Sequence, residues 1–266
     1  MSHLKLACCL IQWAGETRRD LEKALREVAN AGWDGVESYV VDSAEESVCV
    51  ATLARRYNLH WVDVICRDPI QMVKYNIALG NAAVEVPMRA RRDYGEDNPT
   101  DADYERAART LDEVLAFCRT HHIKGYHHAH LGTMIETVRD AERLLAAAAD
   151  LYLLLDTGHL LAAGCDLLQV FRSDTLRHRI AHVHLKDFHA DDPRTQNHRP
   201  CKWGEQGRFA ELGNGDFAPD VKGVLEALGE VGYDGWVSVE LDRPYPVRPP
   251  ADAARANREY LRSLGY

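Results

Sequence analysis

The sequence lacks long hydrophobic runs, and no stretch approaches the roughly 18–20 consecutive apolar residues that a membrane-spanning helix needs. The apolar run from Met1 to Trp13 is short and carries one lysine, so it predicts a first β-strand rather than a signal peptide. An excess of positive charge is also missing, because the formal net charge is −9. Nucleic acids and membrane surfaces are anionic, so neither is an expected partner.

Two familiar motifs are absent as well. No G-x-G-x-x-G follows the first predicted strand, which argues against a dinucleotide-binding fold. None of the seven cysteines forms a C-x-x-C pair, and their number is odd. We therefore expect unpaired thiols in a reducing, cytoplasmic environment. The cysteines are Cys8, Cys9, Cys49, Cys66, Cys118, Cys165 and Cys201.

What the chain does have is a regular alternation of strand-like and helix-like segments, repeated eight times in 266 residues. Strands separated by helices need parallel crossovers, and eight such units predict one (β/α)₈ TIM barrel over residues 1–266. The expected strands are Leu4–Trp13, Gly35–Tyr39, His60–Cys66, Ala83–Met88, Tyr126–Leu131, Leu151–Asp156, Ile180–Lys186 and Trp236–Leu241. The expected helices are Arg18–Asn30, Ala44–Tyr57, Ile70–Leu79, Asp101–Cys118, Val138–Ala148, Leu167–Arg177, Asp220–Val231 and Ala251–Leu264.

A long polar stretch, Phe188–Asn214, shows no clear period and is too long for an ordinary connection in such a barrel. Long ordered loops tend to be functional, so we expect it near the rim of the active site, as a lid or as a partner contact. Trp203 lies in this stretch and is either a lid contact or plain loop packing.

Metal-ligating side chains collect at the ends of the last four predicted strands. Active-site groups of a TIM barrel lie at the carboxyl ends of its strands, and side chains alternate between the two faces of each strand. One inward-facing set then contains His128, Asp156, His184 and Glu240. A single histidine or aspartate at a strand end is usually a capping or satisfied polar group, but four in register predict a metal site.

Two imidazoles and two carboxylates suit a borderline divalent ion, whereas Ca²⁺ prefers more oxygen ligands. We expect one ion, Mn²⁺ or Co²⁺ first, with Zn²⁺ or Mg²⁺ as alternatives. His128 is either a ligand or a base.

These residues give the chain a resemblance to the xylose-isomerase-like sugar isomerase/epimerase superfamily, and within it to the inosose dehydratase branch. The resemblance spans most of the chain and is strongest between Tyr126 and Asp187. The segments that carry it are Gly32–Glu37, His127–Thr133, Leu154–His159, His182–Asp187, Gly213–Phe217 and Gly232–Trp236.

The resemblance implies a metal held by strands 5 to 8, at His128, Asp156, His184 and Glu240. Epimerases of the superfamily carry a glutamate on strand 5, where this chain has His128, and this departure favours the dehydratase branch. A second departure follows Glu240, where the dehydratases carry a more acidic stretch than Leu241–Pro244.

The resemblance further implies a lyase that dehydrates a keto-cyclitol or keto-sugar, such as 2-keto-myo-inositol, through a metal-stabilised enediolate. His128, His130 or Glu240 would remove the α-proton, and Lys186 would stabilise the oxyanion or protonate the leaving hydroxyl. The residues expected to contact the substrate are Glu37, His159, His182, Asp187 and Trp203. Glu37 is alternatively a rim carboxylate that shapes a hydrogen-bond network.

Other functions stay open from the sequence. The same pocket supports a metal-dependent isomerase or epimerase of a ketose, because return of the proton at another carbon gives isomerisation. A hydrolase related to abasic-site endonucleases would need a cationic groove, which the net charge disfavours. A non-catalytic sugar-binding subunit is a further alternative. Because many barrels of this superfamily are oligomers, a homodimer or homotetramer is expected.

Overall fold

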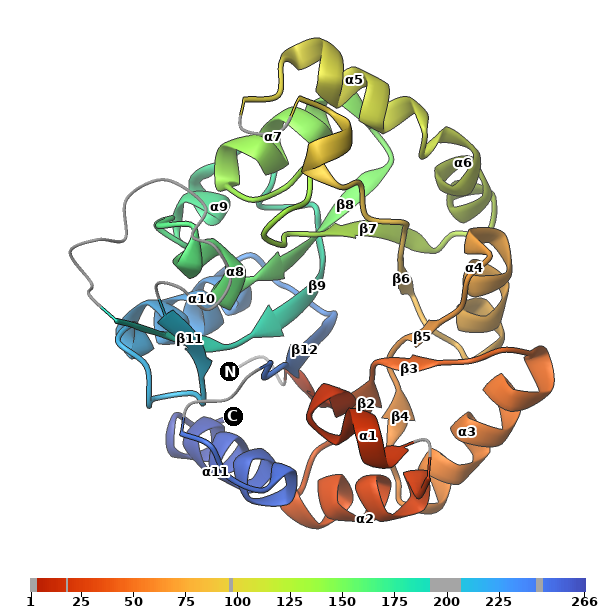
Figure 1. Cartoon of the computed structure of the whole chain (residues 1–266), viewed down its shortest axis with the longest axis vertical. Helices are drawn as coiled ribbons and strands as arrows, with labels where there is room; N and C mark the ends of the chain where they lie inside the picture. The colour runs from red at the N-terminus through yellow and green to blue at the C-terminus, as the bar shows by residue number, and fades with distance from the viewer. Residues whose placement is uncertain (1–3, 18, 96–97, 192–206, 243–245) are drawn as a thin grey trace.

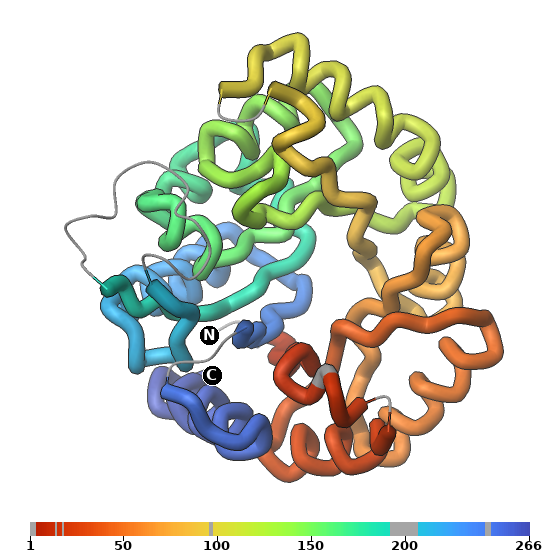
Figure 2. Tube along the Cα trace, viewed as in Figure 1, coloured from red at the N-terminus to blue at the C-terminus, as the bar shows by residue number. Residues whose placement is uncertain are grey.

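The computed structural model describes residues 4–17, 19–95, 98–191, 207–242 and 246–266, and its trace runs once around a ring (Figure 2). Eight strands form one parallel sheet in the order β4-β2-β1-β12-β9-β8-β7-β6, so the first and last strands of the chain are neighbours. The predicted TIM barrel is therefore confirmed. These strands are β1 (Lys5–Cys9), β2 (Gly35–Glu37), β4 (His60–Trp61), β6 (Ala83–Glu85), β7 (Lys124–His128), β8 (Leu151–Asp156), β9 (Ile180–Leu185) and β12 (Trp236–Val239).

Helices surround this sheet on the outside (Figure 1). Several begin where the sequence provides a cap: the side chains of Asp20, Ser43, Asp68 and Thr137 each accept a hydrogen bond from a backbone N–H of the first turn. The longer helices are α2 (Leu21–Ala31), α3 (Ala44–Arg56), α4 (Pro69–Ala78), α5 (Asp101–Arg109), α6 (Asp112–Thr120), α7 (Val138–Ala147), α10 (Ala218–Glu230) and α11 (Pro250–Ser263). The short ones are α1 (Ala14–Thr17), α8 (Thr157–Ala162), α9 (Gln169–Arg172) and the 3₁₀ turns η1 (Leu10–Trp13) and η2 (Arg91–Asp93). None of the helices in the described ranges is long and apolar enough to cross a membrane.

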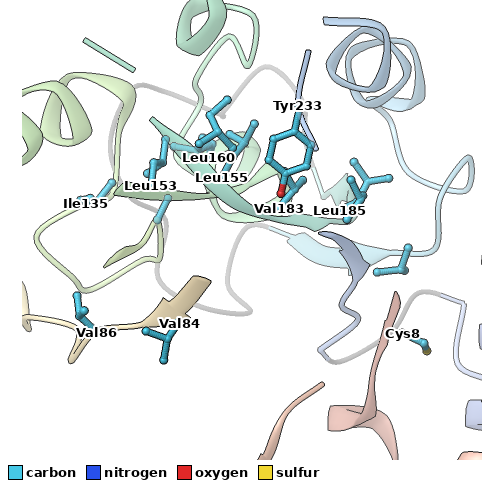
Figure 3. Packing of buried hydrophobic residues seen from close by; sticks show 14 of the residues in the cluster. Cys8, Val84, Val86, Ile135, Leu153, Leu155, Leu160, Val183, Leu185 and Tyr233 are labelled. Carbon is cyan, nitrogen blue, oxygen red and sulfur yellow. The ribbon is translucent and has the colours of Figure 1, made fainter. Parts of the chain in front are cut away.

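The alternation of side chains divides the strands into two faces. Leu153 and Leu155 on β8, with Val183 and Leu185 on β9, belong to the main hydrophobic core between sheet and helices (Figure 3). The opposite face points to the barrel interior, where the register pairs Asp156 with His184. The same inward face therefore carries polar groups at the carboxyl ends of the strands.

The hydrogen-bonded ladder ends at β4 and β6, and among the described residues a carboxylate bridges this gap instead. Asp63, just after β4, accepts a hydrogen bond from the phenol of Tyr126 at 2.7 Å and a longer one from the backbone N–H of Glu85 at 3.4 Å. Directly after β2 and β4, the short strands β3 (Tyr39–Val40) and β5 (Val64–Ile65) pair in parallel and extend the carboxyl end of the sheet.

Several predicted segments differ from the structure: the helix expected over Asp101–Cys118 is divided into α5 and α6, and the strand expected over His60–Cys66 is divided into β4 and β5. The first strand ends at Cys9 and continues as a 3₁₀ turn, and the helix expected over Leu167–Arg177 is only the short α9. The stretch Phe188–Asn214 is not entirely irregular, because β10 (Asp187–Ala190) and β11 (Gly207–Ala210) pair as an antiparallel ribbon.

Two apolar residues and one glycine hold that ribbon. The rings of Phe188 and Phe209 are buried and lie 5.9 Å apart. A Cβ at Gly207 would come within 2.4 Å of the carbonyl oxygen of His189, so only glycine allows this close pairing. Residues 192–206, including Trp203, lie outside the described part of the chain.

Candidate active site

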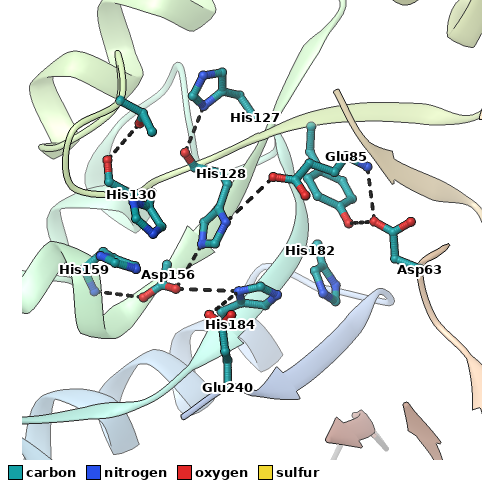
Figure 4. A network of polar contacts seen from close by, with 12 residues as sticks. Asp63, Glu85, His127, His128, His130, Asp156, His159, His182, His184 and Glu240 are labelled. Atoms are coloured by element: carbon teal, nitrogen blue, oxygen red, sulfur yellow. Dashed lines mark hydrogen bonds and ion pairs between the residues drawn. The ribbon is translucent and has the colours of Figure 1, made fainter. Parts of the chain in front are cut away.

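Four side chains from successive strands of the sheet converge inside the carboxyl end of the barrel (Figure 4). Nε2 of His128 lies 3.1 Å from Oδ2 of Asp156, and Nδ1 of His184 lies 3.6 Å from the same oxygen. Nδ1 of His184 is also 2.9 Å from Oε2 of Glu240. One ligand atom from each residue lies within 4.8 Å of all the others, and all four residues are buried. We call these four residues the metal cluster.

The donor set of the metal cluster fits a divalent ion. Neighbouring ligands of one such ion lie about 3 Å apart, since each bond is about 2.0–2.3 Å long. The separations of 2.9–3.6 Å match this spacing. In addition, Nδ1 of the buried His184 faces the carboxylates of the cluster itself, Glu240 at 2.9 Å and Asp156 at 3.6 Å. Two imidazole nitrogens and two carboxylate oxygens are the ligands expected for Mn²⁺, Co²⁺ or Zn²⁺.

A fully buried lysine lies against the cluster. Nζ of Lys186 is 2.6 Å from Oε2 of Glu240, 3.0 Å from Oδ2 of Asp156 and 3.5 Å from Oδ2 of Asp242. Burial lowers the pKa of Lys186, but the carboxylates of Asp156 and Glu240 outweigh this and raise it above its usual value. Lys186 therefore carries a positive charge at neutral pH.

Gly158 makes room for that lysine. A Cβ at this position would lie 2.2 Å from Cγ of Lys186, so the Asp-Thr-Gly-His segment needs glycine for close packing. Asp156 also caps α8, because its Oδ1 accepts a hydrogen bond from the backbone N–H of His159 at 2.8 Å. One carboxylate oxygen of Asp156 thus caps α8, and the other belongs to the metal cluster.

Two further histidines lie beside the cluster. The rings of His130 and His159 are 3.7 Å apart, and the ring of His130 is 5.3 Å from that of His128. His130 lines the cavity, whereas His159 is 1% exposed. The structure brings His130 to the cavity wall and places His159 directly behind it.

Glu37 and His182 lie below the cluster rather than on the cavity wall. Oε2 of Glu37 is 2.7 Å from Nε2 of His182, and Oε1 is 2.7 Å from Nε2 of His184. Burial raises the pKa of Glu37, but His184 and His182 outweigh it and lower the pKa well below its usual range. Glu37 is 2% exposed, so its observed contacts are with imidazoles. This matches the rim-network alternative for Glu37 and not a substrate contact.

Asp187 also has a different environment from the one expected of a substrate contact. Its carboxylate accepts hydrogen bonds from the backbone N–H groups of Phe188, Gly215 and Phe217. A Cβ at Gly215 would lie 2.3 Å from Oδ1 of Asp187, which explains the glycine in this turn. The buried Asp187 therefore holds the turn that precedes α10.

The metal cluster opens onto a cavity of about 530 Å³. His128, His184 and Glu240 line it together with two carboxylates that the sequence analysis did not select, Glu85 and Asp242. Further lining residues are Leu10, Ile11, Thr17, Ser38, Tyr39, Val40, Ile65, Met88 and His130.

Glu85, the last residue of β6, adds a carboxylate to the wall of the cavity. Its Oε1 lies 3.8 Å from Nδ1 of His128. The pKa of Glu85 is raised to about 8, mainly by burial and secondly by the negative charge of the neighbouring Asp63. Strand alternation could have identified Glu85 from the sequence. Glu85 pairs with Tyr126, and Tyr126 lies two residues before His128, so all three side chains point to the same face of the sheet. Asp242 lies two residues after Glu240. Burial raises the pKa of Asp242 most, and the neighbouring negative charge of Glu240 raises it further.

Known proteins share this fold and part of this sequence. The family described as xylose isomerase-like TIM barrel matches residues 25–264. An inosose dehydratase of Mesomycoplasma hyopneumoniae (strain J) is 26% identical over 295 residues, which cover 99% of this chain and 97% of the relative. Among solved structures, the probable 3-DHS dehydratase AsbF from Bacillus anthracis has a TM-score of 0.70 at 14% identity, covering 97% of this chain and 99% of that one. IOLI protein with a binding zinc atom has a TM-score of 0.70 at 17% identity, covering 98% of both chains.

Proposed function

The chain belongs to the xylose isomerase-like TIM barrel family, and on that basis we propose that it is a divalent-metal-dependent lyase that removes water from a keto-cyclitol or keto-sugar. The proposed substrate class includes 2-keto-myo-inositol, because the relative of similar length from Mesomycoplasma hyopneumoniae is an inosose dehydratase. The observation that carries the proposal is the buried metal cluster at the wall of a substrate-sized cavity.

His128, Asp156, His184 and Glu240 would hold the ion. A divalent ion bound there would act as a Lewis acid toward the ketone oxygen and a neighbouring hydroxyl of the substrate. IOLI, whose structure contains a zinc atom, shares the fold and supports the presence of a metal in barrels of this shape.

His130 is the residue that we assign to removal of the α-proton. It lines the cavity beside His128 and does not belong to the metal cluster, and its Nδ1 lies 2.7 Å from the carbonyl oxygen of Leu131, a contact that orients the ring. A histidine base is suited to proton transfer near neutral pH. His128, the alternative base, faces Asp156 and fits the role of a ligand better.

We assign Lys186 to the leaving hydroxyl. Its ammonium group donates a hydrogen bond to Oε2 of Glu240 and lies against Asp242, which lines the cavity. A buried ammonium group in this position would stabilise negative charge that develops on oxygen beside Asp242 as the hydroxyl leaves.

The alternative function, isomerisation or epimerisation of a ketose, uses the same first proton transfer. The two reactions differ in the product, because dehydration lowers the mass by one water and isomerisation leaves it unchanged. The histidine at position 128 supports dehydration, since the superfamily resemblance associates a glutamate at that place with epimerases.

The test is turnover of 2-keto-myo-inositol by purified protein loaded with Mn²⁺ or Co²⁺, followed by mass spectrometry and ultraviolet absorbance. We expect loss of one water, abolition by a chelator and recovery when the metal is restored. His130→Gln should lower kcat about 10²–10⁴-fold, whereas His178→Gln, at an exposed histidine, should not change it. Full turnover in the presence of the chelator, or none by the loaded enzyme, would contradict the proposal.

A further inference from the structure

The cavity of the proposed active site has two unlike sides. Strands β7, β8, β9 and β12 supply the metal cluster on one side. On the other, segments that follow β1, β2, β4 and β6 supply five large apolar side chains, which we call the apolar wall. These residues are Leu10, Ile11, Val40, Ile65 and Met88.

Exposure of apolar surface is concentrated at this wall. Ile11, Val40 and Met88 are 37%, 46% and 42% exposed. Across the described part of the chain, the other exposed large hydrophobic residues are Val48 and Val247, and neither lines the cavity. Clustered exposed apolar side chains mark a binding surface more often than scattered ones do.

The polar residues on this side of the cavity are Thr17, Ser38, Tyr39 and Glu85, and the hydroxyls of Ser38 and Tyr39 are both engaged within the protein. The thiol of Cys9 lies 3.0 Å from the hydroxyl of Ser38 and donates to it, and the hydroxyl of Tyr39 donates to Glu46 at 3.4 Å. 2-Keto-myo-inositol carries a hydroxyl on every ring carbon except the ketone carbon. Burying those hydroxyls against Ile11, Val40 or Met88 would cost hydrogen bonds with water and return none.

The size of the cavity points the same way. About 530 Å³ falls in the range of roughly 300–1,000 Å³ that holds a drug-sized ligand. A free keto-cyclitol is much smaller than such a ligand. The cavity therefore has room for a substituent in addition to a polyol ring at the metal cluster.

We propose that the substrate is a keto-polyol that carries an apolar substituent, an aryl or alkyl group, which lies on the apolar wall while the polyol ring faces the metal cluster. This inference rests on the proposed function and specifies its substrate class. A small molecule is the favoured occupant, because the apolar wall lines one cavity together with His128 and Glu240 instead of facing away from them.

The test compares 2-keto-myo-inositol with its mono-O-benzyl ethers, substituted at carbons remote from the ketone, using metal-loaded full-length protein. Transfer of a benzyl group from water to an apolar surface predicts a kcat/KM about tenfold or more higher for at least one ether. Met88→Gln and Val40→Thr should lower this ratio of ether to parent. Val48→Thr is the matched control, because Val48 is exposed but lies outside the cavity, and it should leave the ratio as it is.

Equal or lower kcat/KM for every ether would overturn the inference while turnover of 2-keto-myo-inositol still supported the proposed function. A shift from oligomer to monomer in Val40→Thr, without a change in the ratio, would also overturn it, because the wall would then be an interface between copies of this chain. No turnover of any of these compounds would count against the proposed function itself. A binding measurement with the benzyl ethers would still show whether the wall accepts the substituent.

Discussion

Oε1 of Glu37 lies 2.7 Å from Nε2 of His184, and the other nitrogen of the same ring faces Glu240 and Asp156. The two residues come from β2 and β9, on opposite sides of β1 and β12 in the sheet. A carboxylate behind a metal-binding imidazole fixes the orientation and tautomer of the ring. Glu37 thus orients His184 so that Nδ1 points to the metal cluster.

Replacing Glu37 by glutamine should weaken metal binding. The substitution keeps the size of the side chain but removes the charge that holds Nε2 of His184, so we expect about 10–100-fold lower affinity for Mn²⁺ or Co²⁺. Competition with a chromogenic chelator measures this directly and does not depend on the substrate. Glu105→Gln, on the exposed surface of α5, is the control. Equal affinities in both variants would show that Glu37 does not orient the ligand.

Lys186→Met should destabilise the metal-free protein by about 3–5 kcal/mol, because it leaves buried carboxylates without their cation. Added Mn²⁺ should restore more stability to this variant than to the parent protein, since the metal neutralises the same oxygens. Urea unfolding with EDTA and with Mn²⁺ measures both effects. Lys222→Met, at an exposed helix position, is the control. A loss below about 1 kcal/mol without metal would contradict the role given to Lys186.

The stability of the metal-free protein should fall as the pH rises from 6.5 to 8. Burial raises the pKa of Asp63 to about 7 and that of Glu85 to about 8. Burial lowers the pKa of His184, but Glu240 and Glu37 outweigh it and raise that pKa well above 6.5. In this window the folded state binds more protons than the unfolded state, so stability decreases with rising pH.

Buried neutral histidines act in the opposite direction, but at lower pH. Burial lowers the pKa of His127 to about 3 and that of His128 to about 4, so their contribution grows with pH up to their unfolded value of 6.5 and then stays level. Above pH 6.5 we therefore expect a net fall of roughly 2–4 kcal/mol. Urea unfolding in EDTA at several pH values tests the sign.

Asp63→Asn isolates one contribution to that slope. It removes the titrating carboxyl but keeps an oxygen to accept the hydrogen bond from Tyr126, so the fall should shrink by roughly 1 kcal/mol. Asp42→Asn, at an exposed position, should leave the slope as in the parent protein. Stability that rises between pH 6.5 and 8 would show that Asp63 and Glu85 are ionised in the folded protein.

Strand alternation and the family resemblance together predicted that the four residues of the metal cluster share one rim, and the structure brings these residues together. His128, Asp156 and His184 each end a strongly apolar or histidine-rich strand, and parallel strands bring their carboxyl ends to one rim. The same rule applies to Glu85, which pairs with Tyr126 on the inward face. It was missed because β6 carries one carboxylate and no motif that marks it.

Two features could not be predicted from the sequence: how deep a side chain lies in the barrel, and which loop segments pair as strands. A carboxylate at a strand end faces either the cavity or a neighbouring imidazole, and the position of Glu37 in the sequence does not distinguish these. The β10–β11 ribbon was missed because its strands are far apart in the chain, and because the contact of Phe188 with Phe209 depends on the fold. The helix predicted over Leu167–Arg177 from its periodicity is only the four-residue α9.

The metal content of the purified protein, after saturation with Mn²⁺ or Co²⁺ and removal of free ion, tests the central claim most directly. We expect about one equivalent in the parent protein, and less than about a tenth of this in Asp156→Asn and His184→Ala, with circular dichroism unchanged. Asp156→Asn retains an oxygen to cap α8, so its loss of metal would not follow from loss of the helix. Full metal occupancy in both folded variants would contradict the account.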